Sequence, residues 1–131
     1  MHPHFIPFER LTDEEYAAQS YDTICNFVVL MSLDEPELRR LHSPPWYDIG
    51  LEAWSDASEV TRLLKRSDVL RGPLDVHLAH EIRSHVERLL SDRSILWTVD
   101  EFSTAERWAD SRRIMRSFVD RLGLTGVPYS K

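Results

Sequence analysis

The stretch from Ile24 to Met31 constrains the fold more than any other part of the sequence. It reads Ile-Cys-Asn-Phe-Val-Val-Leu-Met, so apolar side chains occur on nearly every side of a helix. A helix that is hydrophobic all round must be enclosed by other elements or by lipid. This run is much shorter than the roughly 20 residues that cross a membrane. We therefore expect residues 16–33 to form a buried helix at the centre of a small soluble domain.

Start signals before and after this run predict further helices. Thr12 followed by Glu15 matches a capping box, in which each residue binds the backbone of the other and starts a helix. Asp34, with a proline two residues later, predicts a short helix that ends near Leu41. A third helical segment is expected over residues 51–66 after an irregular loop rich in proline and aromatic residues.

The second half of the chain has the clearest helical periodicity. After Pro73, residues 74–92 form an amphipathic pattern, whose inward side chains are predicted to be Val76, Ala79, Ile82, Val86, Leu89 and Leu90. A last helix is expected over residues 104–122, with Gly123 at the position that favours a left-handed cap. Residues 95–99 suit either a short strand or part of a helix, and we expect them to form a buried crossing segment.

These patterns predict a single all-α domain over residues 1–131, a bundle of about five helices. Residues 1–11 are expected to form an extended arm and residues 124–131 an irregular tail. With 42% hydrophobic and 29% charged residues, the composition is that of a globular protein. The one cysteine, Cys25, cannot form an internal disulfide, and we find no secretion signal at the N-terminus. We therefore expect a cytoplasmic protein.

The charge is unevenly distributed along the chain. Residues 1–60 contain 12 acidic and 3 basic residues, a balance of −9, whereas residues 61–131 contain 10 acidic and 13 basic residues, a balance of +3. An acidic half argues against nucleic acid as a partner, because phosphate binding requires clustered Lys and Arg, and it suits a basic protein. The alternative is that acids near helix starts only complement the helix dipoles.

The proline-rich loop and the helix after it carry the predicted partner-binding residues. Aromatic side chains in a stiff loop offer contact area at a low entropic cost, and acids beside them would attract a basic partner. The predicted set is Trp46, Tyr47, Asp48, Glu52, Trp54 and Asp56. The alternative role for these aromatic side chains is to cover the core, where Trp and Tyr usually lie in small domains.

Three histidines and a glutamate on the helix 74–92 form a candidate metal site. At about 100° per residue, His77 and Glu81 fall in the middle of the polar face, with His80 and His85 at its two sides. Zinc or iron would be the expected metal. The spacing does not match His-Glu-x-x-His, because the second histidine comes one residue too late. The alternative is a solvated helix face, with no cofactor.

The last helix carries five arginines mixed with three acids. A phosphate or RNA site is one interpretation, and surface ion pairs are the other; the arginines are Arg107, Arg112, Arg113, Arg116 and Arg121. We find no glycine-rich phosphate loop, nucleophile elbow or paired-cysteine zinc motif. The leading hypothesis is a protein-binding module of the inhibitor or immunity type rather than an enzyme. The alternatives are a metal-binding protein or metal-dependent helical enzyme, and a homodimeric helical subunit.

Overall fold

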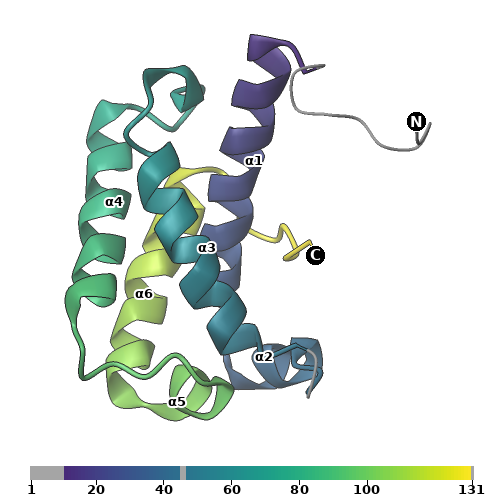
Figure 1. The fold of residues 1–131 in the computed structure, drawn as a ribbon, viewed down its shortest axis with the longest axis vertical. Helices are drawn as coiled ribbons and strands as arrows, with labels where there is room; N and C mark the ends of the chain where they lie inside the picture. The colour runs from purple at the N-terminus through teal and green to yellow at the C-terminus, as the bar shows by residue number, and fades with distance from the viewer. Residues whose placement is uncertain (1–10, 45–46, 131) are drawn as a thin grey trace, which may run out of the picture.

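The computed structural model describes residues 11–44 and 47–130, which fold into helices without any strand (Figure 1). The predicted arm 1–11 and the end of the predicted tail lie largely outside these ranges. The elements in order are α1 (Asp13–Ser32), α2 (Glu35–Leu41), α3 (Ile49–Leu63), the 3-10 turn η2 (Ser67–Val69), α4 (Val76–Ser91), α5 (Val99–Thr104) and α6 (Glu106–Arg121). The all-α prediction is confirmed.

Helix α1 begins at the predicted capping box. The Thr12 hydroxyl accepts a hydrogen bond from the Glu15 amide at 3.0 Å, and the Glu15 carboxylate accepts one from the Thr12 amide at 3.2 Å. From residue 24 to residue 31 every side chain is buried except that of Asn26. Helices α3 and α6 both pack against α1 and cover this segment.

Two predicted helix starts need correction. Helix α3 begins at Ile49, two residues before the predicted segment, because the Asp48 carboxylate caps it by accepting from the Gly50 amide at 2.9 Å. Helix α4 begins only at Val76, because Asp75 caps it through the Leu78 amide at 2.8 Å. Val76 is 65% exposed, so its predicted place in the core is wrong.

The predicted last helix is in fact two helices, α5 and α6, separated by Ala105 in an extended conformation. The Ser103 hydroxyl does not cap α6 but donates to the Val99 carbonyl oxygen at 2.7 Å within α5. The Arg112 guanidinium reaches back from α6 and donates to the carbonyl oxygen of Phe102 at 2.7 Å and of Ser103 at 3.2 Å. Because these carbonyls at the end of α5 gain partners, the helix can stop there.

The segment before α5 passes close to the first turn of α3. A Cβ atom built on Gly50 would lie 2.4 Å from the Trp97 carbonyl oxygen and 2.7 Å from the Thr98 carbonyl carbon. Only glycine permits this approach of two backbones. Residues 95–98 thus cross α3 without forming a strand, and α5 begins directly after them.

We predict that Gly50→Ala destabilises the protein by about 2–3 kcal/mol, because the new methyl group meets fixed backbone atoms. Helix propensity alone predicts the opposite sign, since alanine is favoured over glycine by about 1 kcal/mol in a helix interior. Urea unfolding of both proteins measures the difference. Gly72→Ala is the control: its Cβ meets nothing within 4 Å, so its cost is limited to the strain at φ +53°. Equal stability of Gly50→Ala and the wild type would rule out this packing.

Candidate functional site

Three of the predicted partner-binding residues line one pocket. Its volume is about 440 Å³, and it lies where α1 and α3 meet the C-terminal segment that leaves α6 (Figure 1). Tyr47, Glu52 and Asp56 all line it. The other lining residues come from α1 and from the end of the chain: Thr23, Asn26, Phe27, Tyr129 and Ser130.

The two carboxylates in this pocket share one side of α3, and neither pairs with a cation of the described residues. Burial, together with the charges of Glu52 and Glu59, raises the pKa of Asp56 from 3.8 to about 6. Glu59 forms an ion pair with Arg62 at 2.5 Å. Within residues 11–44 and 47–130, no ion pair includes Glu52 or Asp56. The pocket therefore holds negative charge that the described part of the chain leaves uncompensated.

Two tyrosines form the polar wall opposite these acids. Tyr47 is half-buried against the core, and Tyr129 lines the same pocket and contributes to the raised pKa of the Tyr47 phenol. Burial is the main reason that the pKa of each phenol lies above its usual value, and Glu52 and Asp56 add to the effect. Both phenols are therefore neutral. Tyr129 was not predicted as a site residue. The signal that could have identified it is the run Val127-Pro128-Tyr129, whose apolar and aromatic side chains indicate that the tail packs against the helices.

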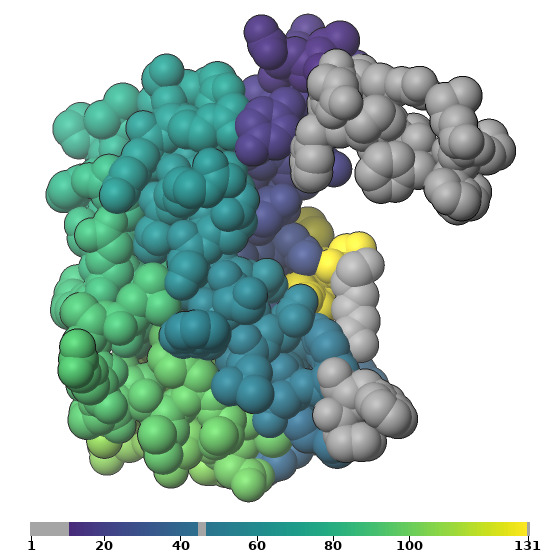
Figure 2. Space-filling view, in the orientation of Figure 1, coloured from purple at the N-terminus to yellow at the C-terminus, as the bar shows by residue number. Residues whose placement is uncertain are grey.

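The remaining predicted residues have different surroundings. The Asp48 carboxylate caps α3 by accepting hydrogen bonds from the Gly50 and Leu51 amides, so it is already engaged within the chain. Trp54 is 51% exposed and lies one turn after Leu51, which is 55% exposed, on the outer side of α3. Helix α3 faces the viewer in Figure 2, where it is coloured teal. Trp46 lies outside the described residues.

Three of the predicted metal residues, His80, Glu81 and His85, line one pocket between α4 and α6, but other contacts engage two of them. His85 is buried, and its Nε2 lies 2.9 Å from the Ser111 hydroxyl on α6. Its predicted place at the edge of the polar face is therefore wrong, because α6 covers that edge. The Glu81 carboxylate binds Arg121 at 3.1 and 2.5 Å. His77 and His80 are exposed. Among the residues that the structure describes, no three His, Cys, Asp or Glu side chains form a group suited to a metal ion.

Each of the five arginines on the last helix donates to a group of the same chain. Arg112 binds the end of α5, and Arg116 donates to the Ser32 carbonyl oxygen at 3.1 Å. Arg107 donates to the Ser94 carbonyl oxygen at 3.0 Å, and Arg113 pairs with an acid one turn before it on α6. Arg121 binds Glu81. Two of the five thus form ion pairs and three bind carbonyl oxygens, so contacts within the chain engage all of them.

No protein-family model, curated protein or solved structure matches this chain. Across the described residues, none of the helices has the length and apolar character needed to cross a membrane. The function is therefore inferred from the chemistry of the site itself.

We predict that Asp56→Asn stabilises the free protein at pH 7.5 by on the order of 1 kcal/mol after solvent screening. The folded pKa of Asp56 is about 6 and its ordinary value is 3.8, so its charge destabilises the fold above pH 6. The advantage of Asn should shrink as the pH falls from 6 towards 4, which urea unfolding at several pH values measures. Asp68→Asn is the control with the opposite sign, because Arg66 lowers the pKa of Asp68. If Asp56→Asn were less stable than the wild type at pH 7.5, that result would contradict the raised pKa of Asp56.

A second pH effect is expected from the buried histidine. Burial lowers the pKa of His85 from 6.5 to about 4, so between these values the unfolded chain binds a proton that the folded chain does not. Stability is therefore full above pH 6.5 and falls by on the order of 2 kcal/mol as the pH drops to 4. His85→Gln should remove this part of the pH dependence, whereas the exposed-site variant His77→Gln should retain it. If the stability of the wild type and of His85→Gln fell equally between pH 6.5 and pH 4, His85 would not be the source of this pH dependence.

Proposed function

We propose that this protein binds a basic protein partner around α3, as an inhibitor or immunity-type protein. The observation that carries the proposal is the half-buried acid pair Glu52 and Asp56, which forms no ion pair within the described residues and lies on the same helix as the exposed Trp54. The binding surface, called here the α3 surface, consists of Leu51, Glu52, Trp54 and Asp56.

The acid pair supports a binding role because it lowers the stability of the free protein. A carboxylate whose pKa is raised by burial and by a like charge is held in an unfavourable state. A lysine or arginine from a partner would offset one of the two charges in a partly desolvated site, where ion pairs are stronger than on open surface. Binding would then lower the pKa of Asp56 and release protons, so affinity should rise between pH 5 and pH 7.

The exposed apolar residues supply the other part of the surface. Trp54 and Leu51 each leave about half of their surface in water. Interface energy is concentrated in a few large side chains, with Trp, Tyr and Arg enriched among them. Trp54 lies about 160° around the helix from Glu52 and from Asp56, so a partner that contacts both must pass around α3, with an apolar recess on one flank and cationic side chains on the other. The excess of acids in residues 1–60 would also speed the encounter with such a partner.

The test is comparative capture from the native host at low salt, in the cytoplasmic fraction where we propose that the protein acts. We expect the wild type to retain a basic protein that salt releases. Trp54→Ala, and separately the double charge reversal Glu52→Lys with Asp56→Lys, should lower the affinity for that purified protein at least tenfold.

Two control variants test whether binding requires the α3 surface itself or only an exposed apolar side chain and an acidic charge elsewhere on the protein. Val76→Ala shortens the more exposed Val76 on α4, and Glu106→Lys reverses a charge on α6; both should bind like the wild type. Equal binding by the α3 variants and the controls would overturn the proposal. Retention of only a second copy of this chain, shown by sedimentation, would replace it with the homodimer hypothesis.

A further inference from the structure

The last described residues of the chain form a strap, defined as residues 124–130, that crosses α1. Gly123 ends α6 with φ +72°, and the Leu124 amide donates to the Val119 carbonyl oxygen at 2.9 Å, so the chain turns away from the helix axis. Gly126, at φ +85°, turns it again. Most of the strap is exposed, with Leu124 and Tyr129 as its half-buried residues. Few contacts therefore hold the strap to the helices.

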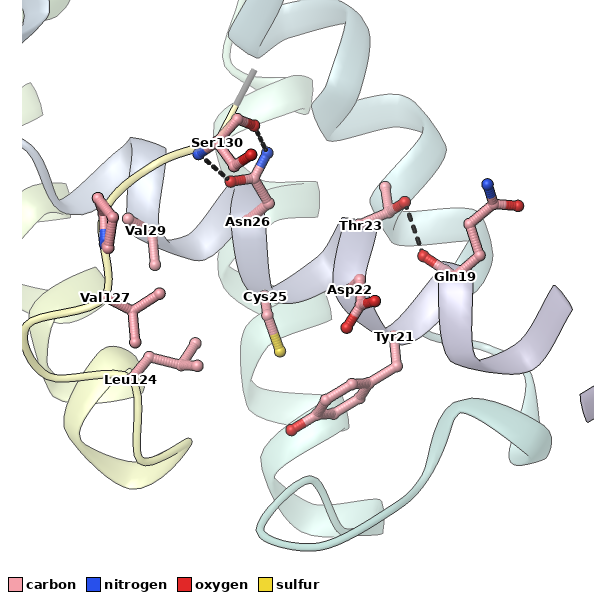
Figure 3. Close-up of a pocket in the computed structure, with 11 residues that line it drawn as sticks. Gln19, Tyr21, Asp22, Thr23, Cys25, Asn26, Val29, Leu124, Val127 and Ser130 are labelled. Carbon is pink, nitrogen blue, oxygen red and sulfur yellow. Dashed lines mark hydrogen bonds between the residues drawn. The ribbon is translucent and has the colours of Figure 1, made fainter. Parts of the chain in front are cut away.

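One side chain of α1 holds the backbone of the strap. The Asn26 amide nitrogen donates to the Ser130 carbonyl oxygen at 2.6 Å, and its oxygen accepts from the Ser130 amide at 2.8 Å (Figure 3). Both backbone groups of one extended residue are thus bound by one amide. Such a clamp recognises main chain rather than a particular side chain, as strand-like peptide binding does. The same contact would accept any extended segment that follows this path.

The strap runs between two pockets that belong to one groove. The first, of about 480 Å³, has an apolar wall of Val29, Leu124 and Val127, and Cys25 points into it (Figure 3). The second is the acidic pocket of about 440 Å³ described above. Both pockets include Thr23, Asn26 and Ser130. The strap therefore lines both pockets and leaves open space beside it on α1 and α3.

The strap fits the apolar part of this groove better than the acidic part. Val127 and Pro128 line the apolar pocket together with Val29, so apolar side chains share that end of the groove. At the acidic end the strap presents Tyr129, a neutral phenol, to Glu52 and Asp56. A neutral phenol offsets none of this negative charge, whereas a lysine or arginine at this position would offset one of the two charges.

We infer that this groove binds an extended segment of the basic partner, held by the Asn26 clamp with a lysine or arginine at the place of Tyr129, and that the strap is a weak internal substitute for it. The inference rests on the proposed function, which it deepens by naming the form of the bound segment. The strap would have to leave before the partner segment enters, so it lowers the affinity of the free protein.

The preference of the groove is tested first within the full chain, without any partner. We compare Tyr129→Lys with Tyr129→Gln, which is neutral and of similar length, by hydrogen exchange at the Ser130 amide at pH 8. Lysine should slow this exchange roughly three- to fivefold relative to glutamine, the effect of a partly exposed ion pair. The difference should vanish when Glu52→Gln and Asp56→Asn are added. Equal exchange in both variants, or a difference that survives removal of the acids, would overturn the inference.

Binding in trans is tested with the peptide acetyl-Gly-Val-Pro-Lys-Ser-amide, using the same peptide with glutamine for lysine as the reference. Tyr129→Ala should bind the lysine peptide several-fold more tightly than the wild type does, because the strap competes less. Asn26→Ala should lose this binding, and Ser58→Ala, at an exposed position of α3 that lines neither pocket, should behave like the wild type. No preference for the lysine peptide, or full binding by Asn26→Ala, would refute the groove.

The two proposals fail in different ways. If the peptide binds in this pattern but no basic protein depends on the α3 surface, the groove stands and the proposed function falls. If a basic partner depends on Trp54 and Asp56 but binds Asn26→Ala and the Tyr129 variants like the wild type, the proposed function stands and the groove inference falls.

Discussion

Burial of the apolar segment of α1 is the constraint on which the rest of the structure depends. Seven side chains between Ile24 and Met31 are buried, and fully burying a large apolar side chain contributes roughly 1.5–3 kcal/mol. Helices α3 and α6 provide the cover, and the close approach of Gly50 to Trp97 lets the segment before α5 pass over the start of α3. Asn26 is the one polar side chain in this segment, and its position between two pockets makes it the clamp for the strap.

Seven acids of the described residues pair with an arginine and others do not, so what distinguishes the acidic pocket is that its unpaired carboxylates are half-buried and close to each other. Glu59, Asp68 and Glu81 each pair with an arginine. Glu52 and Asp56, on the same helix as Glu59, have no such partner in the described part of the chain, and burial holds the pKa of Asp56 high. Natural proteins accept local instability where a site must bind something. The same pocket combines this charge with neutral phenols and a backbone clamp, so one groove offers contacts to both a cationic side chain and its main chain.

Local signals predicted the parts of the fold that are decided locally. The capping box at Thr12 and the left-handed Gly123 depend on residues a few positions apart, and both are confirmed. The break at Ala105 was missed because Arg112 stabilises the end of α5 from the next helix, which no local pattern shows. The burial of His85 was missed because it depends on contacts with Ser111 and Phe118 on α6, which the pattern within one helix does not show. Glu52 and Asp56 were identified from charge and spacing, but Tyr129 and Asn26 join the site only through the path of the strap.

The most direct test of the account is the titration of the Asp56 carboxyl carbon by NMR in the free wild-type protein. A half-buried acid without a cation should titrate with a midpoint of about 6, well above its ordinary value of 3.8. That result would establish the uncompensated charge on which the proposed function and the groove both depend. A midpoint at or below 3.8 would show that Asp56 is solvated or already paired, and it would contradict the account.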